Sequence, residues 1–266
     1  MATQAPGQRT VLAGPHDPIR IVPVHGVDQI SQLVGGAPPS APPKLVYNGG
    51  PLLTATEVFT VFWGSAWQQA PQTTLLTQIN AFFDFILTSP LMDQMAEYNV
   101  PGKTIGHGKR VGTATITSPA LHHSVSDHAI QHTLEQEIAT NATFPQPNPN
   151  LLYFVYLPPG VSVSQGGSRS CQAFCGYHDQ INNGQIYYAA MPYPGCNGCT
   201  GGLSALDALT GTSSHELCEA ITDAIPGQGW YDQANGEIGD ICAWTTKQLG
   251  EYVVQKEWSN AANACV

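Results

Sequence analysis

The chain has 266 residues, with 19 acidic against 9 basic side chains and a formal net charge of −10. Nucleic acids and anionic membranes attract clusters of Lys and Arg. The one adjacent basic pair here is Lys109-Arg110, so the sequence predicts neither as a partner. No run of residues approaches the roughly 20 apolar positions that a membrane-spanning helix needs. The low charged fraction, 11%, favours an extracellular protein with long ordered loops.

The first 45 residues differ in composition from the rest. Prolines are frequent, and residues 37–43 read Ala-Pro-Pro-Ser-Ala-Pro-Pro, which is typical of an extended linker. Short apolar patches at 19–24 and 27–33 could dock on the main body. We therefore divide the chain into a proline-rich extension or pro-segment over 1–45 and a main domain over 46–266. An export remnant and a disordered tail are the alternatives for the extension, and no signal-peptide pattern opens the chain.

Strands and helices interleave along the main domain. Runs rich in β-branched and aromatic residues predict strands at 57–63, 113–117, 151–157, 185–190 and 252–255. Apolar residues at helical spacing predict helices at 73–87, 127–140 and 204–222, and Ser126 can cap the second of these. The pattern predicts an α+β fold, a single domain with a mixed sheet backed by helices.

Seven cysteines indicate an oxidising compartment. We expect three local disulfides that leave Cys218 free, and therefore a secreted protein. A structural metal site that uses the C-x-x-C pair Cys196 and Cys199 is the alternative, although a second C-x-x-C is missing.

The strongest chemical signal is His215-Glu216-Leu217-Cys218-Glu219, within the last predicted helix. Positions four apart share one face of a helix, so His215 and Glu219 can bind one metal ion together. In H-E-x-x-H metallopeptidases the Glu of the motif takes a proton from the activated water, and carboxylate oxygens also bind zinc at about 2 Å. We expect His215 and Glu219 to be ligands and Glu216 to be the general base. A solvated helix face is the alternative for the motif alone.

Acidic residues downstream of the helix supply further predicted ligands. Glu237 lies 18 residues after Glu219 (237 − 219) and is the expected third ligand, since catalytic zinc sites usually have three. Asp240 is grouped with the metal site and could orient His215 as a carboxylate behind it. Zinc is the expected ion. Manganese or iron would also suit two carboxylates and one histidine, and calcium could bind as a structural ion.

Two further residues are candidates for catalysis. His178, in Cys175-Gly176-Tyr177-His178, could be a ligand or an oxyanion donor, and a structural histidine is the alternative. Tyr231 could stabilise a tetrahedral intermediate, although an aromatic side chain after Gly-Trp is more often used for packing.

These segments together resemble the phosphate-induced, EXORDIUM-like family. The matching motifs run in order over roughly residues 46–266: G-P-L-L-T at 50–54, C-G-Y-H at 175–178, H-E-L-x-E-A-x-T-D at 215–223, G-W-Y at 229–231 and E-I-G-D at 237–240. Plant members of that family are linked to cell-wall growth, and bacterial relatives look like zincin-type peptidases. The resemblance implies a zincin-like fold with the site on the H-E-x-x-E helix.

The predicted function is hydrolysis of peptide bonds by a monomeric zinc endopeptidase acting on peptide or protein substrates. An extended peptide could lie along the strand at 185–190 by strand addition. The alternative is a non-catalytic extracellular cell-wall or carbohydrate-binding protein whose metal is structural. A glycosidase pair of Glu216 and Glu219 is a weaker idea, because both project from one helical turn and could not flank a glycosidic bond.

Overall fold

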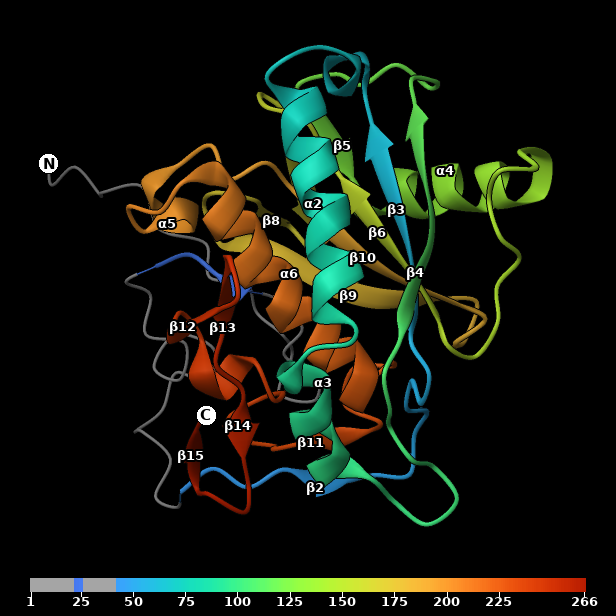
Figure 1. The fold of residues 1–266 in the computed structure, drawn as a ribbon. Coiled ribbons are helices and arrows are strands. Elements are labelled where there is room, and N and C mark those ends of the chain that lie inside the picture. Colours follow the sequence, from blue (N-terminus) through green and yellow to red (C-terminus); the bar gives the residue numbers. More distant parts are fainter. Residues whose placement is uncertain (1–21, 26–41) are drawn as a thin grey trace, which may run out of the picture.

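The computed structural model describes residues 22–25 and 42–266. The predictions for the patch at 27–33 and for most of the linker at 37–43 lie outside the described residues. The centre of the fold is a six-stranded sheet in the order β1-β9-β10-β6-β3-β4 (Figure 1). Its strands are β1 Val22–Pro23, β9 Phe174–Ile181, β10 Ile186–Met191, β6 Leu151–Tyr156, β3 Glu57–Trp63 and β4 Lys109–Ile116.

The sheet is mixed. Strands β4, β3, β6 and β10 run parallel to one another. Strand β9 runs antiparallel to β10, and the two-residue β1 runs antiparallel to β9. Four small sheets surround this one: β2 Val46–Tyr47 with β11 Trp230–Tyr231, β12 Thr246–Leu249 with β13 Tyr252–Gln255, β14 Trp258–Ser259 with β15 Ala264–Cys265, and β5 Ser124–Ser126 with β7 Ser162–Gln165 and β8 Ser168–Arg169.

Helices cover both faces of the central sheet. The helices are α2 Gln72–Ile86, α3 Pro90–Met95, α4 Asp127–Thr140, α5 Asn197–Thr200 and α6 Ala205–Thr222, with short 3-10 turns at Ser65–Gln68, Ala96–Tyr98 and Asp240–Cys242. Helices α2 and α6 lie side by side in front of the strands in Figure 1, and α4 lies behind them. The α+β class with a central mixed sheet is therefore confirmed.

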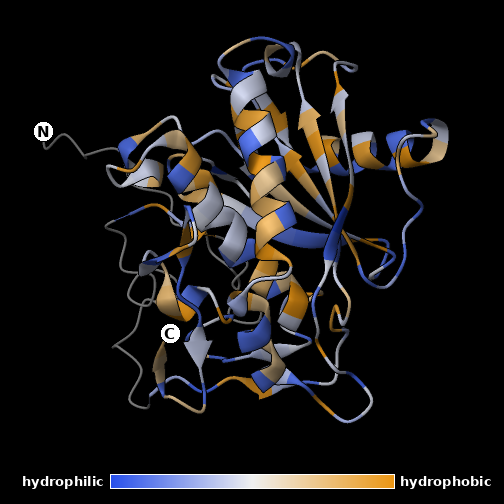
Figure 2. Ribbon diagram, viewed as in Figure 1, coloured by the Kyte–Doolittle hydropathy of each residue, from blue (hydrophilic) through white to orange (hydrophobic). Residues whose placement is uncertain are grey.

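Alternate residues of the central strands divide between two cores. In β6, Phe154 and Tyr156 pack with α2 and α6, whereas Tyr153 and Val155 pack with α4. The side-chain period of a strand is two, so a strand covered on both faces reads as an unbroken apolar run. Figure 2 shows these strands coloured mainly as hydrophobic.

The predicted helices and strands are found within a few residues of their expected ends, with one consequential omission. Strand β9 was not predicted, because Cys175, Gly176, His178 and Asp179 interrupt its apolar pattern. The strand predicted at 185–190 as a peptide platform is β10, which lies between β9 and β6 and has both edges paired. That part of the prediction is wrong, because strand addition needs an unpaired edge.

Three disulfides form, and Cys218 keeps a buried free thiol. The bridges join Cys171 to Cys196, Cys175 to Cys199 and Cys242 to Cys265. The C-x-x-C pair is therefore split between two bridges. Disulfides of this kind are typical of proteins that fold in an oxidising, extracellular environment.

Within the described residues, no single helix is long and apolar enough to cross a membrane. Helix α2 and the segment Pro90–Tyr98, which meet at a bend, reach the required length and apolar composition only when they are taken together.

The packing of α2 on the sheet makes a testable prediction about stability. Phe154 is fully buried, and its ring centroid lies 4.6 Å from that of Phe83 in α2. Phe154→Ala should lower the free energy of unfolding by about 3–5 kcal/mol, since it leaves a cavity in this core. Urea denaturation measures this value. Val46→Ala, at an exposed position, is the control and should change it by less than about 0.5 kcal/mol. A loss below about 1 kcal/mol for Phe154→Ala would contradict the packing described.

Candidate metal centre

Helix α6 carries the H-E-x-x-E motif through the interior of the protein. The helix begins after Ser204, whose hydroxyl accepts a hydrogen bond from the amide of Asp207 at 3.1 Å. From residue 208 to its end it is buried on every side, with contacts to β9, β10, β13 and α2. His215, Glu216 and Glu219 are each 0% exposed, so the motif does not form a solvated helix face.

One group of candidate ligands surrounds His215. Its Nε2 lies 2.8 Å from Oε1 of Glu219, one turn further along the helix, and 4.0 Å from Oδ1 of Asp240. The three residues offer ligand atoms that all lie within 4.8 Å of one another. Asp240 was expected behind His215 or as a ligand, and its position in this group is compatible with direct ligation.

A second group surrounds His178, on strand β9. Its Nε2 lies 3.1 Å from Oε1 of Glu237 and 3.7 Å from Oε2 of Glu219. These ligand atoms also lie within 4.8 Å of one another. The structure therefore brings Glu237 to His178, whereas the sequence predicted Glu237 as a partner of His215. Glu219 belongs to both groups and lies between the two histidines.

The loop that carries Glu237 and Asp240 is fixed by hydrogen bonds to the motif helix and to β13. The amide of Asp240 donates to Oε1 of Glu219 at 3.1 Å, and the amide of Glu237 donates to Oδ2 of Asp240 at 3.0 Å. Gln255 of β13 donates its Nε2 to the carbonyl of Gly239 at 2.8 Å. Glu237, 18 positions after Glu219, is thereby returned to the buried motif helix.

Gly239 is required for the close approach of this loop to His215. A Cβ at position 239 would lie 2.8 Å from Cγ and from Nδ1 of the His215 ring, a separation that real side chains do not adopt. The E-I-G-D pattern contained this glycine, but its role could not be inferred before the fold placed it against the ring.

Glu216 faces the sheet at β9. A Cβ on Gly176 would lie 3.1 Å from Oε1 of Glu216, so the carboxylate stands directly over that glycine. Neither oxygen of Glu216 has a hydrogen-bond partner among the described residues. A buried carboxylate without a hydrogen-bond partner lowers the stability of the folded protein. Such a group therefore calls for a functional explanation.

Burial dominates the electrostatics of this region. Burial raises the pKa of Glu216 well above its ordinary value; the charge of His215 opposes this rise, and the charges of Glu219 and Asp240 add to it. Burial, followed by the charge of Glu219, also raises the pKa of Glu237. For His215, burial lowers the pKa, but the charge and hydrogen bond of Glu219 outweigh it and the pKa is raised well above its ordinary value.

Two further buried acidic residues lie near the candidate ligands. Asp223 accepts hydrogen bonds from the amides of Gly227, Gln228 and Gly229 at 2.6, 3.0 and 2.5 Å, and burial raises its pKa to about 7. Glu257 is fully buried, and burial raises its pKa as well. Sequence analysis missed Glu257, because no motif surrounds it.

The donor set fits a divalent transition metal. Imidazole nitrogen and carboxylate oxygen suit zinc, manganese and iron. Oε2 of Glu219 is buried and has no hydrogen-bond partner among the described residues, so it is available to a cation. Tetrahedral zinc at about 2.0–2.2 Å from each ligand spaces the ligand atoms about 3.3–3.6 Å apart, within the 4.8 Å limit of both groups.

Tyr231 lies in β11, where its backbone pairs with Val46 of β2. It is buried, and its role as a stabiliser of a reaction intermediate stays a prediction.

Neither the protein-family models nor the curated proteins give a match to this chain. The resemblance to EXORDIUM-like proteins therefore stays a prediction, carried by the motifs quoted above.

The shared position of Glu219 makes the first prediction about the site. Glu219→Gln should lower zinc affinity by more than 100-fold, because it removes a ligand from both groups. Loss of a residue that only hydrogen-bonds to a metal ligand already lowers metal affinity by about 10- to 100-fold. Equilibrium dialysis with Zn²⁺ and metal analysis measures this affinity. Glu251→Gln, in the exposed turn between β12 and β13, is the matched control. Equal zinc binding by the two variants would refute both ligand groups.

A second prediction concerns Gly239. Gly239→Ala should lower zinc affinity by about 10-fold or more, because the new methyl group displaces the His215 ring or the loop. The control is Gly211→Ala in the same helix as His215, where an added Cβ meets no atom within 4 Å. That change should leave zinc affinity unaltered and stabilise the helix by up to about 1 kcal/mol. Unchanged zinc affinity in Gly239→Ala would show that the loop does not position the histidine.

Proposed function

We propose that this protein is a secreted, zinc-dependent endopeptidase, with Glu216 as its general base. The observation that carries the proposal is the position of Glu216. Its carboxylate is fully buried and lacks a hydrogen-bond partner among the described residues. It interacts electrostatically with His215, Glu219 and Asp240, which form one of the ligand groups, and its Oε1 lies over Gly176 of β9.

The residues of the site have separate roles in this proposal. His215, Glu219 and Asp240, or His178, Glu219 and Glu237, would hold the ion. When bound, zinc would polarise the scissile carbonyl and make water more acidic. Glu216 would accept the proton of that water and later deliver it to the leaving amine. Burial raises the pKa of Glu216, and a raised carboxyl pKa is the direction that proton acceptance followed by proton donation requires.

The architecture around the site supports a zincin-like arrangement. The motif helix α6 packs against β9 and β10, and β9 is the antiparallel strand near one end of the sheet. A substrate that pairs with such a strand lies extended beside the helix. The peptide platform of this proposal is the outer edge of β9, in place of the strand at 185–190, and the two-residue strand β1 pairs with that edge in this structure.

A specific observation favours a second candidate function. All the candidate ligands are 0–3% exposed, as expected for a structural metal held in the interior. A non-catalytic extracellular protein of the cell-wall or carbohydrate-binding type, with zinc or calcium as a structural ion, would have this feature.

The two functions differ in the outcome of one substitution. Glu216→Gln should retain zinc at the wild-type level and lower turnover of fluorescence-quenched casein by at least about 100-fold, because general-base catalysis contributes about 10²–10⁴. Metal analysis and the casein assay on the same sample measure both. His215→Ala is the companion variant and should lower zinc content and turnover together.

Turnover equal to that of the wild type in Glu216→Gln would refute the role of this residue. Zinc retained by the wild type, with no turnover of casein in any form of the chain, would favour the structural-metal protein.

A further inference from the structure

A short piece of the N-terminal extension lies on the sheet edge beside the metal centre. Strand β1 pairs antiparallel with β9, with Val22 opposite Gly176 and Pro23 opposite Phe174. Val22 is 0% exposed. Without β1, β9 would present an unpaired edge of N–H and C=O groups. This segment therefore occupies the position in which an added strand would bind.

Backbone hydrogen bonds extend the docking beyond the two paired residues. The amide of Val24 donates to the carbonyl of Ala173 at 3.2 Å, and the amide of His25 donates to the carbonyl of Gly198 at 2.6 Å. The carbonyl groups that accept these bonds come from the loop before β9 and from α5. The segment is thus held through its main chain, as a bound extended peptide would be.

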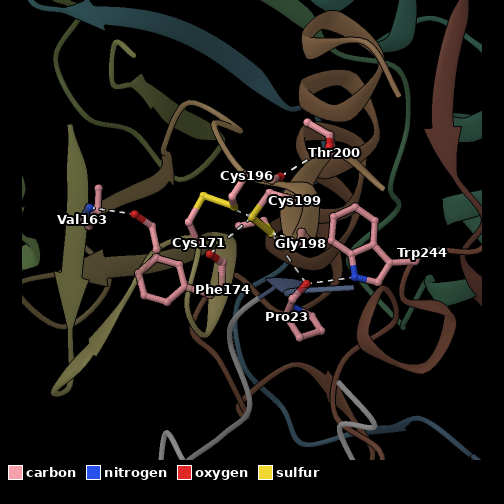
Figure 3. Close-up of a disulfide and its surroundings, with 11 residues drawn as sticks. Pro23, Val163, Cys171, Phe174, Cys196, Gly198, Cys199, Thr200 and Trp244 are labelled. Atoms are coloured by element: carbon pink, nitrogen blue, oxygen red, sulfur yellow. Dashed lines mark hydrogen bonds between the residues drawn. A yellow bond between two sulfur atoms is a disulfide. The ribbon is translucent and has the colours of Figure 1, made fainter. Parts of the chain in front are cut away.

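Side chains on both sides form a receptor for the segment. The indole Nε1 of Trp244 donates to the carbonyl of Pro23 at 2.9 Å, and the Trp244 ring stacks on His25 with centroids 3.7 Å apart. On the other side lie the disulfides of Cys171 and Cys175, which pack with Val22 and Val24 in one small apolar cluster. Figure 3 shows the hydrogen bond between Pro23 and Trp244, with Cys199 and the disulfide of Cys171 and Cys196 nearby.

The occupied edge lies next to the proposed general base. Gly176, which faces Val22 across the ladder, is the residue over which Oε1 of Glu216 lies, 3.1 Å from an ideal Cβ. Neighbouring strands are about 4.8 Å apart. A peptide in the place of β1 therefore passes within about one strand spacing of the backbone beneath Glu216.

We propose that the β9 edge is a binding strand for extended peptides with β-branched side chains, and that Val22–His25 occupies it as an internal inhibitory segment. Release of the segment exposes the edge to substrate. The inhibitory consequence rests on the proposed endopeptidase function, whereas the peptide-binding surface stands on the contacts above.

The test uses the full chain with Val22→Asp and Val24→Asp together, because two carboxylates cannot be accommodated in the apolar cluster. The matched control is Val46→Asp with Val111→Asp, which places the same charges on exposed valines. The probe is a fluorescein-labelled peptide with the sequence of residues 19–28, and a peptide with Asp in place of both valines is its control.

Three readouts are expected from the segment variant. Hydrogen exchange over residues 173–178 should become faster than in the wild type and in the control variant. The labelled peptide should bind at least 10-fold more tightly to the segment variant than to the wild type, whose edge is occupied. Casein turnover should rise at least 10-fold, and Glu216→Gln in the same background should abolish that gain.

The outcomes separate the two proposals. Unchanged hydrogen exchange together with equal peptide binding would overturn the peptide-binding edge. Faster exchange and tighter peptide binding without any casein turnover would support the edge and refute the endopeptidase. If the double variant does not fold, Trp244→Phe replaces it. That change removes the N–H donor to Pro23 and keeps an aromatic ring against His25. Faster hydrogen exchange at residues 173–178 is again expected. An unchanged exchange rate in this variant would overturn the proposal.

Discussion

The rest of the structure depends on how the negative charge of a cluster of buried carboxylates is balanced. Glu216, Glu219, Glu237 and Asp240 converge in a region with almost no exposed surface. Each buried charge costs several kcal/mol unless it is paired or neutralised, and His178 and His215 are the basic groups among them. Divalent cations are the compensation that such donor sets ordinarily receive.

The surrounding elements are arranged to keep these groups in place. Helix α6 is buried along nearly its whole length, because it packs between the central sheet, α2 and β13. The bridge between Cys242 and Cys265 joins the loop after Glu237 to the end of the chain. These contacts leave few conformations to the ligand loop, and pre-positioned ligands are what a metal site needs.

The same geometry connects the metal centre to the edge of the sheet. Strand β9 supplies His178 to one ligand group, places Gly176 beneath Glu216, and pairs with Val22 on its other side. One strand therefore carries a candidate ligand, contacts the proposed general base and pairs with an extended segment.

The sequence by itself determined the elements whose signals are local. The strand at 57–63, the helix that begins after Ser126 and the helix of the H-E-x-x-E motif follow from apolar periodicity and capping over a few residues. The i and i+4 spacing likewise placed His215 beside Glu219. Strand β9 escaped prediction because its polar residues serve the site and break the apolar pattern.

Tertiary structure alone decided which distant residues meet. Glu237 lies with His178, and not with His215 as the sequence predicted, because β9 brings His178 to the same side of Glu219 on which the loop after α6 places Glu237. The pairing of the four clustered cysteines and the docking of Val22 on β9 were decided in the same way. Spacing along a chain fixes neighbours within one helix or strand. Contacts between elements depend on how they pack, and no local pattern records that.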